Sequence, residues 1–154
     1  MSNVLIREKV QPYSMEAEIS VLGSMLIDND TIGLVAQILN ANSFYKTAHI
    51  HIFEAILNLY DKQRVVDLVL LKDELYKRSL LDKVGGFEYL MELEESVPIT
   101  ANVEFYAKIV REKAIKRDLI AATTKIQQKA YHDSLESDEL LDLAEKSIFD
   151  ITQQ

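Results

Sequence analysis

The 154-residue chain contains no cysteine, and it has only four glycines and two prolines. The absence of cysteine excludes a disulfide framework, a thiolate zinc site and a thiol nucleophile. Since hairpin turns normally need glycine or proline, the scarcity of both disfavours a sandwich or barrel of short strands and favours an all-helical protein. No apolar run approaches the roughly 20 residues that cross a bilayer, and no secretory signal is recognisable, so we expect a cytoplasmic protein without membrane contact.

Acidic side chains outnumber basic ones by twenty-five to seventeen, which gives a formal net charge of −8 at pH 7. A surface of this average charge repels a polyanion, so bulk binding of nucleic acid is disfavoured. The charge is unevenly distributed, however. Residues 1–100 carry −6, residues 101–131 carry +4 and residues 132–154 carry −6. A basic segment is therefore followed directly by an acidic one.

Apolar residues recur at helical spacing through the first hundred residues. Ser14 is expected to cap the first helix, inside which Gly23 indicates a close contact with another helix. Val65 and Val66 are compatible with a short strand, but the segment leads into Asp67, a good helix cap. The predicted helices span about residues 14–27, 30–40, 47–62 and 87–95. A further helix begins at Asp67, and a glycine turn, Gly85 and Gly86, precedes the last.

The final third of the chain predicts a helical hairpin. No glycine or proline interrupts the segment from about residue 101 to Tyr131, and a helix of that length would measure roughly 45 Å, so part of it must project from a small globule. After a polar break, an acidic helix is expected to fold back antiparallel on the basic one. Because two helices share only one seam, another chain is expected to pack on them. Candidate residues for the seam or a dimer contact are Ile109, Leu141, Ala144 and Ile148.

These patterns predict an all-α fold with a compact helical head and a projecting antiparallel helical hairpin. We place a flexible lead-in at residues 1–12, the head at 13–100 and the hairpin at 101–154.

No motif predicts catalysis, a metal ion or a cofactor. His49 and His51 stand two residues apart and would diverge by about 200° on a helix, so we expect one packed ring and one solvated ring rather than a metal site. The glycine pair lacks the lysine of a phosphate-binding loop. The carboxylates around Glu92 have no basic partner at a convincing spacing and indicate a solvated acidic helix, or else a docking patch for a basic partner.

Several motifs occur in an order that resembles one protein family. Residues 12–23 read PYSMEAEISVLG, and further matches are FY at 44–45, AH at 48–49, VDLV at 66–69, VGGF at 84–87, ANV at 101–103 and KR at 116–117. This string is similar to the N-terminal domain of DnaB-type replicative DNA helicases. Leu70 departs from the pattern, because many relatives have threonine there, and this leaves the helix cap to Asp67.

The resemblance implies a non-catalytic domain, since the family's ATPase activity resides in a RecA-like C-terminal domain with a phosphate-binding loop. It implies a collar on a hexameric ring in which these domains pair through their hairpins, and a landing surface for the C-terminal domain of primase. A helicase loader is a further candidate partner. Carried over by position, the partner-binding residues would be Glu16, Tyr89, Ile120 and Ile126. Tyr89 could equally belong to the core, Glu16 could merely favour the helix dipole, and both isoleucines could lie in the seam or a dimer contact.

Two other function classes remain as alternatives. The basic face of residues 108–129 could bind DNA weakly, although it carries few aromatic residues for base stacking and the acidic helix beside it would neutralise it. A small helical hydrolase would rest only on scattered carboxylates, and no substrate suggests itself.

Overall fold

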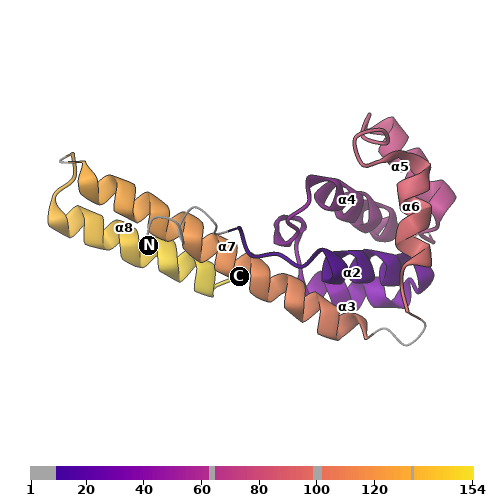
Figure 1. Ribbon diagram of the computed structural model, residues 1–154, viewed down its shortest axis with the longest axis horizontal. Coiled ribbons are helices and arrows are strands. Elements are labelled where there is room, and N and C mark those ends of the chain that lie inside the picture. The colour runs from indigo at the N-terminus through magenta and orange to yellow at the C-terminus, as the bar shows by residue number, and fades with distance from the viewer. Residues whose placement is uncertain (1–9, 63–64, 99–101, 133) are drawn as a thin grey trace. The chain divides into compact units, whose positions relative to one another are not determined.

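A computed structural model describes residues 10–62, 65–98, 102–132 and 134–154 of the chain. Within these residues the regular structure consists of α-helices and one short 3-10 helix, without a strand (Figure 1). The predicted all-α fold is confirmed, whereas the expected lead-in lies outside the described residues as far as residue 9. The elements are α2 (Met15–Ile27), α3 (Asp30–Ile38), η1 (Ala41–Ser43), α4 (Thr47–Asp61), α5 (Leu68–Lys77), α6 (Gly86–Glu95), α7 (Val103–Tyr131) and α8 (Ser137–Thr152).

Two helices begin at the capping residues that the sequence predicts. The Ser14 hydroxyl accepts a hydrogen bond from the backbone N–H of Ala17 at 3.2 Å, at the start of α2. The Asp67 carboxylate accepts one from the backbone N–H of Leu70 at 2.8 Å, at the start of α5. Each side chain satisfies an amide that has no partner within its helix, so both helices are fixed at their first turn.

The conformations of two loops in the head follow from particular residues. Gly85 and Gly86 have φ angles of 108° and 73°, which only glycine adopts without strain, and they form the predicted turn before α6. The Asn29 side chain accepts from the backbone N–H of Val66 and donates to its carbonyl, both at 2.9 Å. Because one side chain satisfies both backbone groups of the buried Val66, this segment needs no strand partner.

The chain divides into two compact units, which we call the head (Tyr13–Ala114) and the hairpin (residues 10–12 and 115–154). The sequence suggests a boundary at residue 100, but the structure places it inside α7. The reason is that the first turns of α7 bury apolar side chains in the core of the head. These side chains are Val103, Ala107 and Val110.

In the head, α2 packs against α3, α4 and α6, and α5 packs against α4 and α6. The approach of α2 to α6 is close at Gly23, where an added Cβ would overlap the carbonyl of Leu93 and the side chain of Val97. The expectation that Gly23 marks a close helix contact is therefore confirmed. The largest fully buried side chains of the core include Leu22, Met25, Ile52, Phe53, Leu71 and Leu90.

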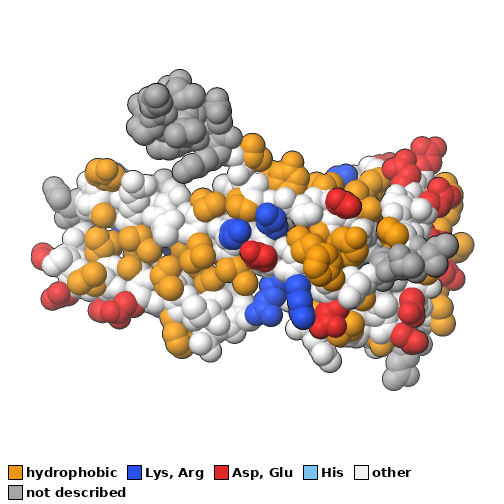
Figure 2. All heavy atoms as spheres, turned by 60° about the horizontal axis from the view of Figure 1, so that its bottom comes forward, with side chains coloured by type: hydrophobic (Ala, Val, Ile, Leu, Met, Phe, Trp, Pro, Cys, Tyr) orange, Lys and Arg blue, Asp and Glu red, His pale blue; other side chains and the backbone are white. Residues whose placement is uncertain are grey.

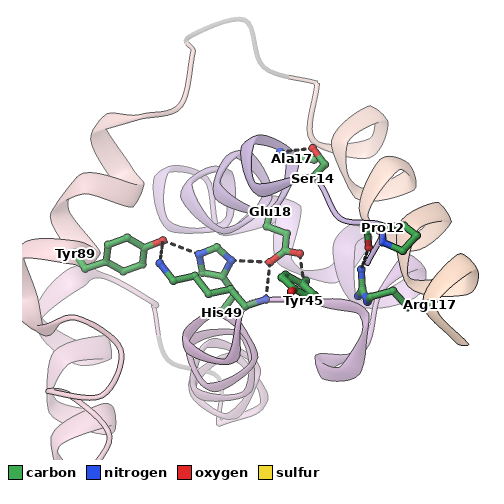
Figure 3. Close-up of polar contacts among 9 residues, drawn as sticks. Pro12, Ser14, Ala17, Glu18, Tyr45, His49, Tyr89 and Arg117 are labelled. Carbon is green, nitrogen blue, oxygen red and sulfur yellow. Dashed lines mark hydrogen bonds and ion pairs between the residues drawn. The ribbon is translucent and has the colours of Figure 1, made fainter. Parts of the chain in front are cut away.

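In the hairpin, α8 returns antiparallel beside the C-terminal part of the 29-residue α7 (Figure 1). None of the α8 side chains is fully buried. The Arg117 guanidinium donates to the carbonyl of Pro12 at 2.7 Å, which attaches residues 10–12 to α7 (Figure 3). Among the described residues, none of the helices combines the length and apolar character that crossing a membrane requires.

Candidate functional site

A buried carboxylate lies where α2 meets the start of α4. The side chain of Glu18 is only 2% exposed. It accepts hydrogen bonds from the backbone N–H of Tyr45 at 2.8 Å and of Lys46 at 3.4 Å (Figure 3). Lys46 is the N-cap residue of α4, and that helix has neither a side-chain cap nor an acidic residue in its first turn. Glu18 therefore supplies negative charge from another helix at the end of α4 where the dipole favours it.

His49 joins this carboxylate to α6. Its ring is fully buried, with Nδ1 at 2.7 Å from Oε1 of Glu18 and Nε2 at 2.7 Å from the hydroxyl of Tyr89. The rings of His49 and Tyr89 also stack, with their centroids 5.9 Å apart. Of the two histidines, for which the sequence predicts one packed ring and one solvated ring, His49 is the packed one and His51 is half-buried. Across the described part of the chain, no group of three or more potential ligands could hold a metal ion.

Tyr89 carries the connection to the ammonium group of Lys46. The Nζ atom of Lys46 lies 3.2 Å from the Tyr89 hydroxyl and 4.3 Å from the centroid of its ring. The cation therefore has both a hydrogen bond and a cation–π contact with the same side chain. We call Glu18, His49, Tyr89 and Lys46 the polar chain. Figure 3 labels the first three of these residues. It links three helices of the head, with a carboxylate at its buried end and an ammonium at the other.

The donor and acceptor in each hydrogen bond of the polar chain follow from elementary chemistry. A lysine ammonium can only donate, so the oxygen of Tyr89 accepts from Lys46. With a neutral imidazole, the Tyr89 hydroxyl then donates to Nε2 of His49, and the Nδ1–H of His49 donates to Glu18. Every proton between the two charged groups has an acceptor in this arrangement. Polar networks that are satisfied in this way are rigid, so they hold their end groups in place.

Aromatic side chains lie next to the polar chain in the sequence. Tyr45, which precedes Lys46, is 41% exposed, and its ring stacks on that of Tyr13 with 4.5 Å between centroids and 6° between planes. Tyr89 itself is half-buried and packs against the core of the head. The head therefore presents exposed aromatic rings close in sequence to a fixed cation.

The four residues expected to bind a partner are divided between the two units. Glu16 is exposed on α2, and it points away from the buried Glu18 because residues two apart on a helix diverge. Tyr89 belongs to the head as well. Ile120, which is 40% exposed, and Ile126, which is half-buried, lie in the hairpin. Of these four, only Tyr89 belongs to the polar chain.

The four residues expected in the hairpin seam or a dimer contact are also divided between the head and the hairpin. Ile109 belongs to the head, where it is partly buried against the core. The other three lie on α8, where Leu141 is 61% exposed, Ile148 is 37% exposed and Ala144 is half-buried. Figure 2 shows hydrophobic side chains gathered along the surface of the hairpin. Ala144 and Ile148 line a shallow hollow together with the exposed Phe149.

The sequence does not identify two residues of the polar chain, Glu18 and Lys46, as members of a site. Glu18 reads as a first-turn carboxylate, although it shares a helix face with the apolar Val21, Leu22 and Met25. A carboxylate on an apolar face indicates a buried partner, but not which one. Lys46 stands at a helix N-terminus, where a cation is unfavourable, and this is the signal that could have drawn attention to it.

Two basic side chains of α7 have contacts within the chain. Lys108 pairs with Glu104 at 3.1 Å, one turn away on an exposed face. Arg117 donates to Pro12. The pair with Glu104 is solvent-exposed and the contact with Pro12 goes to a neutral carbonyl, so the DNA-binding alternative is left to a direct test.

Comparison with known proteins gives one consistent result. Residues 10–112 match the family described as DnaB-like helicase N terminal domain. The chain is 40% identical over 150 residues to the replicative DNA helicase DnaC of Bacillus subtilis and 41% identical to the replicative DNA helicase DnaB of Geobacillus stearothermophilus. Each match covers 97% of this chain and 33% of the relative. The chain therefore spans about a third of the length of these curated relatives.

Solved structures agree with this result. The chain is similar to the N-terminal domain of DnaB helicase from Mycobacterium tuberculosis, with a TM-score of 0.87, 39% identity and coverage of 92% of this chain and 99% of that one. It is also similar to a DnaB-like replicative helicase whose structure is described together with its interactions with primase. That match has a TM-score of 0.74 and 25% identity, and it covers 90% of this chain and 31% of the helicase.

Proposed function

This chain belongs to the family of DnaB-like helicase N-terminal domains, and from this premise we propose that it is a non-catalytic domain that assembles with its own copies and recruits primase. The observation that carries the proposal is the apolar surface of the hairpin. In α8 the large side chains Leu141 and Phe149 are 61% and 59% exposed, and no residue of the helix is fully buried. A hairpin that covers so little of its own apolar surface is typical of an element that packs against another chain.

Self-association would use α8. Burial of one aliphatic side chain contributes about 1.5–3 kcal/mol, and several such residues on each copy must together outweigh the loss of translational and rotational freedom before the copies associate. Leu141, Ala144 and Ile148 recur at steps of three and four residues, which is the spacing of a coiled-coil seam. In the longer helicase, we propose, such contacts form the N-terminal collar of the ring.

Primase recruitment is supported by the relative whose structure is described with primase. Glu16 and Tyr89 of the head and Ile120 and Ile126 of the hairpin are the proposed contact residues. Glu16 and Ile120 are exposed, and Tyr89 and Ile126 are half-buried, so each has surface to offer a partner. A contact of this type would combine apolar anchors with a polar rim.

Self-association is tested by light scattering of the 154-residue chain across protein concentration. We expect the average mass to rise with concentration, and we expect Ile148→Asp to shift the midpoint about tenfold or more to higher concentration. Val69→Asp is the matched control, because Val69 is an exposed aliphatic residue on α5 of the head, 66% accessible to solvent. A monomer at every concentration, or equal effects of the two substitutions, would contradict the assembly role.

Primase recruitment is tested by titrating the C-terminal domain of primase into the same chain. We expect saturable binding that Ile126→Asp weakens while far-UV circular dichroism stays unchanged. Absence of binding by the wild-type chain would refute this part of the proposal.

A further inference from the structure

Lys46 occupies a position that ordinary helix energetics does not favour. It is the N-cap residue of α4, where the helix dipole is positive and where serine, threonine, aspartate and asparagine are preferred. Its ammonium group has no carboxylate within ion-pair distance among the residues that the structure describes. The Glu18 carboxylate at this end of α4 accepts from the backbone N–H of Lys46, while the ammonium group contacts Tyr89. A residue that breaks a local rule is a candidate for function.

The ammonium group is nevertheless held in place. It contacts Tyr89 through both the hydroxyl oxygen, at 3.2 Å, and the face of the ring, at 4.3 Å from its centroid. The Tyr89 hydroxyl is fixed in turn by the fully buried His49, and His49 by the buried Glu18. A lysine on the surface normally loses side-chain entropy when it binds a partner, and this contact meets part of that cost in advance.

The chemistry of the remaining donors limits the kind of partner. An ammonium group has three donors, of which the Tyr89 oxygen takes one. No described carboxylate lies within ion-pair distance of the ammonium group, and a carboxylate is the acceptor that an ammonium group binds most strongly.

We propose that Lys46 is a further primase-binding residue of this domain, and that its ammonium group, positioned by Glu18, His49 and Tyr89, forms an ion pair with a carboxylate of the primase C-terminal domain. This inference rests on the proposed recruitment of primase. It assigns Tyr89 a second task besides direct contact, since the tyrosine also holds the cation.

The first test compares Lys46→Met with Lys62→Met in a titration of the primase C-terminal domain into the 154-residue chain. Both lysines flank α4, at opposite ends of a 15-residue helix about 22 Å long, and both substitutions remove one positive charge. We expect Lys46→Met to weaken binding about tenfold or more, as loss of a charge-assisted hydrogen bond does, and Lys62→Met to leave it within about twofold. Salt should weaken wild-type binding more steeply than that of Lys46→Met.

The second test asks whether Tyr89 acts through Lys46. Tyr89→Phe keeps the ring and removes only the hydroxyl, which bonds both the Lys46 ammonium and Nε2 of His49, so far-UV circular dichroism is used to check that the fold is unchanged. We expect this substitution to weaken binding in the wild-type background and to have a smaller effect in the Lys46→Met background, because the two side chains are coupled. If Tyr89 only supported the fold, Tyr89→Phe would weaken primase binding by the same factor in the wild-type and Lys46→Met backgrounds.

The outcomes separate the two proposals. If the wild-type chain binds primase and Lys46→Met binds equally well, the role of Lys46 is refuted and primase recruitment stands. If Lys46→Met and Lys62→Met weaken binding equally, only a general charge effect exists and the ion pair is refuted. If the wild-type chain does not bind primase at all, recruitment is refuted and the role of Lys46 is refuted with it.

Discussion

The contact between α2 and α6 makes the substitution Gly23→Ala an unusually sharp test of the packing in the head. An added methyl group would overlap the backbone carbonyl of Leu93 and the end of the Val97 side chain. Val97 can turn away, but the carbonyl can move only with α6, by on the order of 1 Å in a close-packed interior. The side chains of Leu90 and Leu93 on α6 are buried, so this shift would disturb the core.

The expected change in the free energy of unfolding for Gly23→Ala follows from two opposing effects. Overpacking of a core contact costs about 1–3 kcal/mol, and replacing a glycine inside a helix by alanine returns about 1 kcal/mol. For a backbone clash we take the upper end of the first range, which leaves the free energy of unfolding lower by about 2 kcal/mol. Gly33→Ala is the matched control, because its new Cβ would lie 3.6 Å from the hydroxyl of Tyr60, an ordinary contact, in the middle of α3. It should stabilise the chain by about 0.5–1 kcal/mol.

Urea unfolding followed by far-UV circular dichroism measures both substitutions. A loss of about 2 kcal/mol lowers the urea midpoint by about 1 M for a chain of this size, whereas the control should raise it. All samples need one protein concentration, because self-association would itself add stability. If Gly23→Ala and Gly33→Ala both raised the midpoint, the reasoning about the α2–α6 contact would be refuted.

Three further predictions follow from the polar contacts and the charge distribution. His49→Ala leaves the buried Glu18 without its nearest partner, so we expect a loss of about 3 kcal/mol or more in the free energy of unfolding, and a loss below 1 kcal/mol in urea unfolding would show that the pair is not needed. Asn29→Ala removes both hydrogen bonds to the backbone of Val66, for which urea unfolding should report a loss of about 2 kcal/mol, while an unchanged midpoint would mean that water replaces the side chain. Titration of the chain into labelled single-stranded DNA at low salt should show at most weak binding that disappears as salt rises, and tight, salt-resistant binding would favour the DNA-binding alternative instead.

Much of the fold could be predicted because its causes are local. Ser14 and Asp67 are capping residues whose partners lie three residues away, so their role can be recognised from the sequence alone. Gly85 and Gly86 adopt backbone angles that other residues avoid, which makes the turn before α6 equally recognisable. Gly23 is an intermediate case, since its presence in a helix indicates a close contact but does not say that the partner is α6.

The candidate site was predicted less completely because its contacts join distant parts of the chain. Glu18 and His49 are 31 residues apart, and His49 and Tyr89 are 40 residues apart. No periodicity relates such positions. Glu16, Ile120 and Ile126 could be named only through a family resemblance, and their contacts with a partner stay predictions.

The sequence by itself determined where the helices form, how two of them are capped and which surfaces are apolar, since these properties depend on side chains within a few residues of one another. The tertiary structure alone decided that Glu18 is buried against His49 and Tyr89, and that Lys46 is held at the end of this chain of contacts. It also decided that the head continues into α7 as far as Ala114, so that Ile109 packs in the head. The physical reason is that burial is a property of the whole packed chain. A helix can be recognised from its own residues, but the surface that covers it comes from elsewhere in the fold.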